Sequence, residues 1–306
     1  MSAAVAVPLT WSVAAESWTF DVFSSALIAV AGGCYARWHR RGGGPRSQAY
    51  CFAAGLAVWF LAGASVIAVY SPVLFWMRAL QTLLLLFVAP FLLALGAPVQ
   101  TWRVAASESG RVVIDRVLAA RWLRYASSPL ATSIAMLGVP WLLYLTPWYV
   151  ASMTGPVAAL TRVLLVAVGA GYFYARLQCD LVPRRFSPLL SIAISVVESL
   201  GDGLLGLVLW LGPLVAYQYY AGLQRNWGPS MRTDQSVGAG ILWILGDVLG
   251  LPFLLMLMRS LGRHAHAVAD EVDTELDHAD PAPAAQSGAL WWDADPQLRE
   301  RFGRRG

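Results

Sequence analysis

The stretch LFWMRALQTLLLLFVAPFLLALG, residues 74–96, decides the fold. It contains a single charged residue, Arg78. A helix needs about 20 mostly apolar residues to cross the hydrocarbon core of a bilayer. Because lipid offers no hydrogen-bond partners, the backbone of such a stretch must satisfy itself, and a helix does so. Residues 74–96 therefore predict a membrane-spanning helix.

The composition of the whole chain agrees with this interpretation. The 306 residues are 58% hydrophobic and 13% charged, whereas soluble domains are about 45–50% apolar and about 25% charged. Pro and Gly separate the apolar runs, as is typical of loops and helix starts. We predict an all-α polytopic membrane protein with seven transmembrane helices, at residues 18–37, 50–70, 74–96, 129–147, 157–176, 189–215 and 237–260. Glycines at 201, 203 and 206, followed by Gly212-Pro213, favour a break in the sixth.

The arginine distribution predicts the orientation. Arginines follow the first, third, fifth and seventh spans, whereas residues 1–17 contain none. Arg176, at the end of the fifth span, is assigned to a cytoplasmic loop on this basis. Positive residues accumulate on the cytoplasmic side, so we expect the N-terminus outside and the C-terminus inside, in a bacterial plasma membrane. The net charge of +4 then implies contact with anionic lipid headgroups and no nucleic-acid partner.

Two regions follow from the pattern. Residues 1–263 form the predicted transmembrane domain, and residues 264–306 form a cytoplasmic tail. The tail is acidic and contains prolines, a composition that cannot bury a core, so we expect disorder. Trp291 and Trp292 near its end suggest docking on a partner or the membrane surface, with an unstructured end as the alternative. No nucleophile triad, phosphate loop, catalytic carboxylate pair or zinc spacing is present, so we do not expect an enzyme.

Histidine and cysteine limit the cofactors. The four histidines, at positions 39, 264, 266 and 278, all fall in predicted loops or in the tail. A bis-His haem site inside the membrane is therefore not expected. Cys34, Cys51 and Cys179 fall near the cytoplasmic leaflet, and their thiolates would suit Cu(I). Without a neighbouring CxxC or HxH, packing is the favoured role for these cysteines, and a copper site is the weaker alternative.

Ionisable residues inside the spans are stronger functional candidates, because they are costly in lipid. We expect a buried polar cluster composed of Arg78, Gln81, Glu198, Asp202 and Asp247. Glu198 and Asp202 are four residues apart and share one helix face. We predict that Arg78 pairs with Asp202 or Asp247. Such a cluster either fixes helix packing through internal ion pairs or forms a pocket for a ligand or partner helix.

Two stretches resemble a known family. The first is the leucine-rich run Leu83–Leu95 with Pro90 inside it, closed by Gly96-Ala97-Pro98. The second is Asp234-Gln235 followed by Gly238, Gly240 and Trp243. Together they are similar to the seven-helix CtaG family of caa3-type cytochrome c oxidase assembly factors, and the tail resembles those of actinobacterial members. From its position we expect Asp234 to be the N-cap of the seventh span.

The resemblance includes one departure. Typical members have a pattern similar to His-x-x-x-His just before the leucine run, where this chain has Arg78 and Thr82. A further histidine of the family aligns near Arg162. The resemblance therefore implies an assembly or accessory factor for cytochrome c oxidase, with oxidase subunits as partners, more strongly than it implies copper delivery. The alternatives are a transporter with a polar path through Arg78, Asp202 and Asp247, and a sensor with a cytoplasmic tail.

Overall fold

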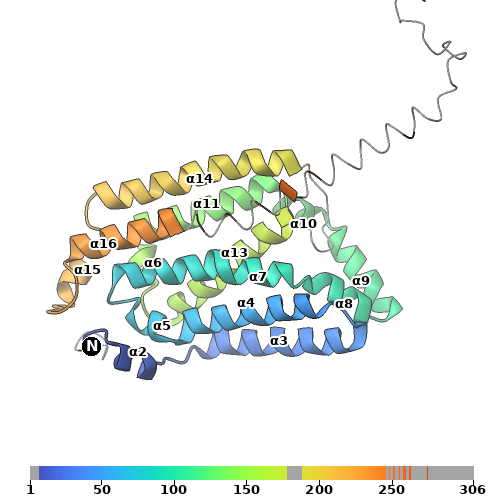
Figure 1. Ribbon diagram of the computed structural model, residues 1–306, viewed down its shortest axis with the longest axis horizontal. Helices are drawn as coiled ribbons and strands as arrows, with labels where there is room; N and C mark the ends of the chain where they lie inside the picture. The colour runs from blue at the N-terminus through green and yellow to red at the C-terminus, as the bar shows by residue number, and fades with distance from the viewer. Residues whose placement is uncertain are drawn as a thin grey trace, which may run out of the picture. The chain divides into compact units, whose positions relative to one another are not determined.

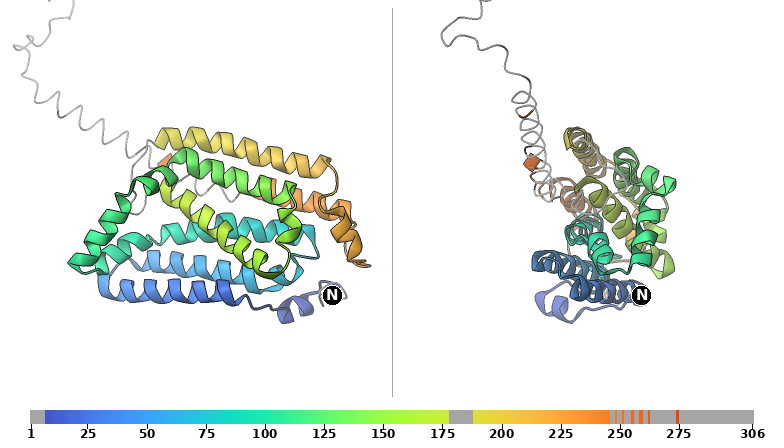
Figure 2. Two further views of the ribbon diagram at one scale, coloured as in Figure 1. Left: turned by 180° about the vertical axis from the view of Figure 1, so that it is seen from behind. Right: turned by 90° about the vertical axis from the view of Figure 1, so that its right-hand side faces the viewer.

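The computed structural model describes residues 7–177 and 188–245, with a few isolated positions beyond them. The chain divides into two units, Met1–Met258 and Arg259–Gly306, and the described elements belong to the first. All its regular elements are helices. Most of the long ones lie close to parallel, while α13 crosses them obliquely (Figures 1 and 2).

The first half of the unit contains α2 (Trp11–Glu16), α3 (Val22–Gly42), α4 (Arg46–Ala64), α5 (Val66–Tyr70), α6 (Phe75–Leu83), the π-helix η1 (Leu84–Val88), α7 (Ala89–Leu95), α8 (Pro98–Ala105), α9 (Glu108–Leu118) and α10 (Arg121–Ala126). The second half contains α11 (Pro129–Leu145), α12 (Trp148–Ala151), α13 (Gly155–Leu177), α14 (Pro188–Leu211), α15 (Tyr217–Gly222), α16 (Met231–Gly240) and a second π-helix, η2 (Ile241–Leu245).

Three of the described helical stretches are long and apolar enough to cross a membrane: Arg46–Tyr70, Phe75–Ala105 and Gly155–Leu177. They correspond to the second, third and fifth predicted spans. The fourth corresponds to the shorter apolar helix Leu130–Leu145. The helix expected at the first predicted span, residues 18–37, lies further along the chain. Helix α3 begins at Val22, after its N-cap Asp21, and continues to Gly42. These helices make the chain a multi-pass membrane protein, and the count of seven spans stays a prediction.

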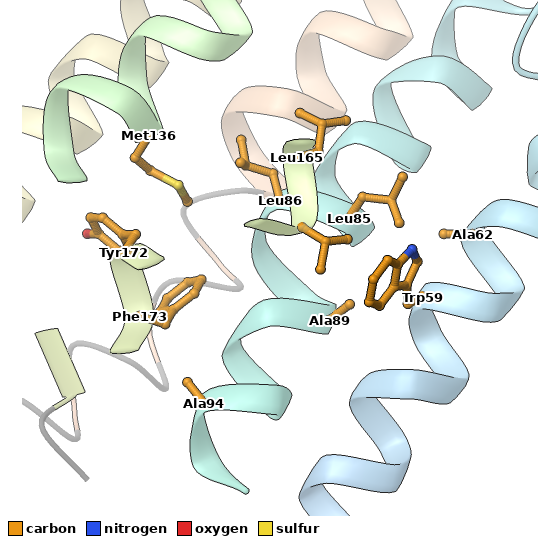
Figure 3. Packing of buried hydrophobic residues seen from close by; sticks show 11 residues of the cluster. Trp59, Ala62, Leu85, Leu86, Ala89, Ala94, Met136, Leu165, Tyr172 and Phe173 are labelled. Carbon is orange, nitrogen blue, oxygen red and sulfur yellow. The ribbon is translucent and has the colours of Figure 1, made fainter. Parts of the chain in front are cut away.

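The segment α6–η1–α7 forms the centre of the bundle. Leu85, Leu86 and Ala89 on this segment are almost completely buried against α4, α11 and α13. Figure 3 shows Trp59 of α4 on one side of it and Tyr172 and Phe173 of α13 on the other. The stretch that decided the fold in the sequence is therefore also the helix around which the others pack.

Pro90 explains the irregular middle of this helix. A proline has no N–H and its ring crowds the carbonyl four residues earlier, here that of Leu86. The backbone widens into η1 just before it, where the Ala89 amide donates to the Leu84 carbonyl. Gly169 of α13 packs against this point: a methyl group there would clash with the Leu86 carbonyl oxygen. The crossing of α13 over the central helix thus depends on a glycine.

The predicted break at the inner glycines of the sixth span is wrong. Helix α14 is continuous through Gly201, Gly203 and Gly206, and ends at Leu211 before Gly212-Pro213. The inner glycines provide space for side chains instead. A methyl group on Gly203 or Gly206 would lie 3.0 or 2.6 Å from the Trp243 side chain of η2. These glycines allow α14 to approach η2 closely.

Candidate functional site

Asp234 joins α16 to the start of the central helix. Its two carboxylate oxygens accept the backbone N–H groups of Phe75 (3.1 Å) and Trp76 (3.0 Å), the first residues of α6. Arg225 approaches the same carboxylate at 3.5 Å. The expectation that Asp234 caps its own helix was wrong, because Ser230 is the N-cap of α16 and accepts from the Thr233 amide. Asp234 instead caps a helix distant in sequence, where its charge suits the helix dipole.

Gln235 performs a related role at the end of α14. Its side-chain amide donates to the carbonyls of Leu209 (2.7 Å) and Pro213 (3.0 Å), and its oxygen accepts the Val215 amide (2.7 Å). The backbone beyond Leu211 leaves helical geometry, so these groups lack helical partners. Asp234 and Gln235 together tie three helices at one end of the bundle. We call this the Asp234 end, where α6 and α16 begin and α14 stops.

Side chains of α3 and α4 contact the turn Gly96-Ala97-Pro98. The Tyr35 hydroxyl donates to the Gly96 carbonyl at 2.8 Å, and a methyl group on Gly96 would lie 2.7 Å from the Phe52 side chain. Ala97 adopts a left-handed conformation (φ 46°), and Pro98 then starts α8. The described signature residues Pro90, Gly96, Pro98, Asp234, Gln235 and Trp243 therefore all have structural roles at helix crossings or helix ends.

Arg78 lies inside the bundle near the Asp234 end, with only 2% of its surface exposed. Its guanidinium donates to Gln81 Oε1 (3.0 Å) and to Ser152 Oγ (2.6 Å) at the end of α12. Among the described residues, its buried Nε has no acceptor. Within the described ranges no carboxylate lies within ion-pair distance of it. The predicted pairing with Asp202 is thus not found, and Asp247 lies outside the described residues.

Several neutral side chains of the described residues lie near this guanidinium. The Tyr144 hydroxyl donates to Thr82 (3.1 Å), and the hydroxyls of Tyr149 and Tyr220 are 2.7 Å apart. Burial raises the pKa values of Tyr149 and Tyr220 well above their ordinary range. Both phenols therefore stay protonated and supply no negative charge to Arg78. We define the Arg78 cluster as Arg78, Gln81, Thr82, Tyr144, Tyr149, Ser152 and Tyr220.

A second buried arginine, Arg176, has a different environment. Its guanidinium donates to Glu198 Oε1 (2.8 Å) and to Ser133 Oγ (2.6 Å). The Tyr172 hydroxyl donates to the other oxygen of Glu198 at 2.6 Å, and the guanidinium stacks 4.9 Å from the Tyr172 ring centre. We define the Arg176 cluster as Ser133, Tyr172, Arg176 and Glu198. It ties α11, α13 and α14 together.

The sequence prediction missed this cluster. Arg176 was assigned to a loop, but only 1% of its surface is exposed, so that assignment was wrong. One signal was available: Tyr172 and Arg176 are one helical turn apart, and Glu198 lacked an assigned partner. The five-residue cluster that we expected is therefore divided. Arg78 and Gln81 lie together, while Glu198 belongs to the Arg176 cluster.

Asp202 lies one turn beyond Glu198 on α14. It lines a small hollow with Thr82 and with apolar side chains of five elements, namely Leu83, Leu86, Phe87, Pro140, Leu205 and Leu242. The hollow lies beside both π-helices, because Leu86 and Phe87 belong to η1 and Leu242 to η2. Asp202 therefore shares a hollow with Thr82, a member of the Arg78 cluster.

The remaining metal candidates do not converge where the structure can be described. No group of three or more His, Cys, Asp and Glu side chains with metal-binding geometry occurs among the described residues. Cys34 and Cys51 are free thiols, and Cys179 lies outside the described ranges. Arg162, near which the resemblance places a further family histidine, pairs with the α3 cap Asp21 at 2.9 Å. A copper site that includes all three cysteines stays an untested prediction.

The comparison with known proteins agrees with the signature residues. A family model for the cytochrome c oxidase caa3 assembly factor (Caa3_CtaG) matches residues 32–264. The chain belongs to this family. The matched range begins within α3 and contains the central helix, both arginine clusters and the Asp234–Gln235 tie.

Several mycobacterial relatives are also similar. An uncharacterized protein of Mycobacterium leprae is 24% identical over 276 residues, which cover 85% of this chain and 42% of the relative. Uncharacterized proteins of Mycobacterium bovis and Mycobacterium tuberculosis are each 23% identical over 292 residues, 89% of this chain and 44% of the relative. The chain thus spans less than half the length of these curated relatives. No solved structure matches it.

Proposed function

We propose that this Caa3_CtaG protein is a non-enzymatic membrane factor required for assembly of a cytochrome c oxidase, with oxidase subunits as its partners. The observation that carries the proposal is the family match over residues 32–264, within which each described signature residue has a defined structural role. We further propose the seven-span topology, with the N-terminus outside and the tail in the cytoplasm, because the arginines favour it.

Arg78 is the residue on which we expect function to depend. Its charge is buried, yet its described partners are the neutral side chains of Gln81 and Ser152. Ionisable groups held inside a membrane bundle are expensive and commonly mark functional positions. The cationic side chain also stands where the resemblance implies a histidine, and a guanidinium repels Cu⁺. Copper handling at this position is therefore not part of the proposal.

Gene deletion with complementation tests this function. Loss of the gene should reduce the haem a absorbance band of the membranes, and the unmodified gene should restore it. Arg78→Met should be present at normal abundance and yet fail to restore the band. Arg40→Gln, which changes an exposed arginine in the last turn of α3, is the matched control and should restore it.

Two outcomes would contradict the proposal. An unchanged haem a band after deletion would remove the assembly function and favour the transporter with a polar path. Full complementation by Arg78→Met would keep the assembly function but show that the buried guanidinium has no part in it. Western blotting for the tagged variants separates either result from loss of the protein.

A further inference from the structure

Helices α9 and α10 carry exposed apolar and aromatic side chains that the rest of the described chain does not cover. Val113 and Val117 of α9 are 50% and 47% exposed, and Trp122 and Tyr125 of α10 are 66% and 77% exposed. Val113 and Val117 lie one turn apart and form a ridge on one face. Trp and Tyr are the residues that favour the boundary between lipid and water.

The orientation of α9 is fixed by its contacts with α8. Ile114, the buried residue of α9, is only 1% exposed. Arg103 of α8 binds both carboxylate oxygens of Asp115, at 3.0 and 3.2 Å. The Arg111 side chain also donates to the Arg103 carbonyl at 3.3 Å. These contacts hold the ridge of Val113 and Val117 in a defined direction away from the bundle core.

The position of α9 is that of a helix lying along a membrane surface. Figure 1 shows α9 crossing the ends of the long helices, beyond α8, instead of running alongside them. The ends there are those of α3, with Arg40 and Arg41 in its last turn, and the start of α4 at Arg46. A segment placed across the ends of membrane-crossing helices lies at the level of the lipid headgroups.

The charge of the segment is complementary to an anionic surface. Residues 103–124 contain five arginines, at 103, 111, 116, 121 and 124, against two acids, Glu108 and Asp115. Arg116 and Arg121 are exposed, and among the described residues neither takes part in an ion pair. Basic residues beside an apolar ridge are typical of segments that bind anionic lipid.

We propose that α9 and α10 form an interfacial segment that binds anionic phospholipid headgroups, with Val113, Val117, Trp122 and Tyr125 inserted into the lipid boundary. The inference rests on the bundle crossing a bilayer but not on its orientation or on an oxidase partner. The segment would set the depth of the helices at this end of the bundle and concentrate anionic lipid beside it.

Site-directed quenching in nanodiscs tests the insertion. In a background with Cys34, Cys51 and Cys179 changed to Ser, single cysteines replace Val113 or Val117 and carry a polarity-sensitive dye. Ala119→Cys is the matched control, because Ala119, the C-cap residue directly after α9, is exposed and lies on the other side of the helix from the ridge. Lipids brominated near the headgroup should quench the dyes at 113 and 117 severalfold more than the dye at 119. Equal quenching by aqueous iodide at all three positions would overturn the proposal and leave the ridge as a surface for a protein partner.

The headgroup preference is tested in the same nanodiscs, which carry identical leaflets and no oxidase. Brominated phosphatidylglycerol and brominated phosphatidylcholine are compared at equal mole fraction. Each arginine near an anionic surface contributes about 1 kcal/mol, roughly a fivefold enrichment of anionic lipid. Quenching at 113 by phosphatidylglycerol should therefore exceed that by phosphatidylcholine by at least about fivefold, and the Arg116→Gln/Arg121→Gln variant should lower the ratio toward one. A ratio of one in the unmodified protein would refute anionic binding, whatever the result of the oxidase test.

Discussion

The bundle buries two arginines in opposite ways. Arg176 shares the carboxylate of Glu198 with Tyr172, so its charge is neutralised by the chain itself. Arg78 has the neutral acceptors Gln81 and Ser152, and the tyrosines near it stay protonated. Both side chains are at most 2% exposed. Burial alone therefore does not distinguish their roles, and the partner does.

This difference separates a structural charge from a candidate functional one. A buried ion pair can hold helices in register, although it adds little net stability. A buried charge without a counter-charge lowers stability and persists where the molecule has another use for it. We therefore interpret the Arg176 cluster as a joint between α11, α13 and α14, and the Arg78 cluster as the better functional site.

The largest expected effect comes from removing the counter-charge of Arg176. Glu198→Ala should destabilise the protein by about 3–5 kcal/mol, because it leaves a guanidinium buried without its carboxylate. Thermal unfolding in detergent measures this. Asp115→Ala is the control: its exposed pair with Arg103, 51% and 41% exposed in the side chains, should matter little. A Glu198→Ala loss no larger than the control would mean that Arg176 and Glu198 are not a joint.

The double variant Arg176→Met/Glu198→Leu sharpens the same point. Replacing both charges by apolar side chains of similar size should recover most of the loss, since no buried charge remains. Additive losses in the double variant would instead show that each residue is needed for reasons unrelated to their pairing.

The sequence predicted the helices better than their polar joints. Apolar length and helix punctuation located the central helix and three further spans, since these properties are local to each segment. The partner of Arg176 could not be read in this way, because Arg176 and Glu198 belong to different helices and an arginine at a span end resembles a loop residue. The same limit applies to Asp234, whose acceptor role depends on Phe75 and Trp76, far away in the chain. Ser152, the second acceptor of Arg78, was missed because it lies in a connection between spans.

A smaller effect is expected at Arg78. Arg78→Met removes hydrogen bonds to Gln81 and Ser152, but it also removes a buried charge that lacks a carboxylate. The two consequences oppose each other, so the loss of stability should be no more than about 2 kcal/mol. Arg176→Met, measured in parallel by thermal unfolding, should cost more, about 3–5 kcal/mol, because it leaves Glu198 buried and charged.

An equal cost for both substitutions would break the comparison. It would show that a negative partner of Arg78 exists beyond the described residues, with Asp247 as the candidate that we predicted. An Arg78→Met/Asp247→Asn double variant would then test the pair directly, since recovery of stability in the double variant identifies coupled charges.

The smallest expected effect concerns the tyrosines near Arg78. The hydroxyls of Tyr149 and Tyr220, 2.7 Å apart, join α12 to α15. Tyr149→Phe and Tyr220→Phe should each cost about 1 kcal/mol, and the double variant should cost about the same as either single one, because both changes remove one hydrogen bond. Tyr50→Phe, at a tyrosine that is 73% exposed, is the control and should have no effect.

The same substitutions test whether an ionised tyrosine balances the charge of Arg78. If the Tyr149 hydroxyl were ionised, it would be the missing counter-charge, and its removal would be as damaging as Glu198→Ala. A near-ultraviolet tyrosinate band in the folded protein at neutral pH, lost in Tyr149→Phe, would reveal that state. A cost of about 1 kcal/mol with no such band leaves Arg78 a buried cation among neutral groups. In that case Glu198 balances the charge of Arg176, whereas no ionised tyrosine balances the charge of Arg78.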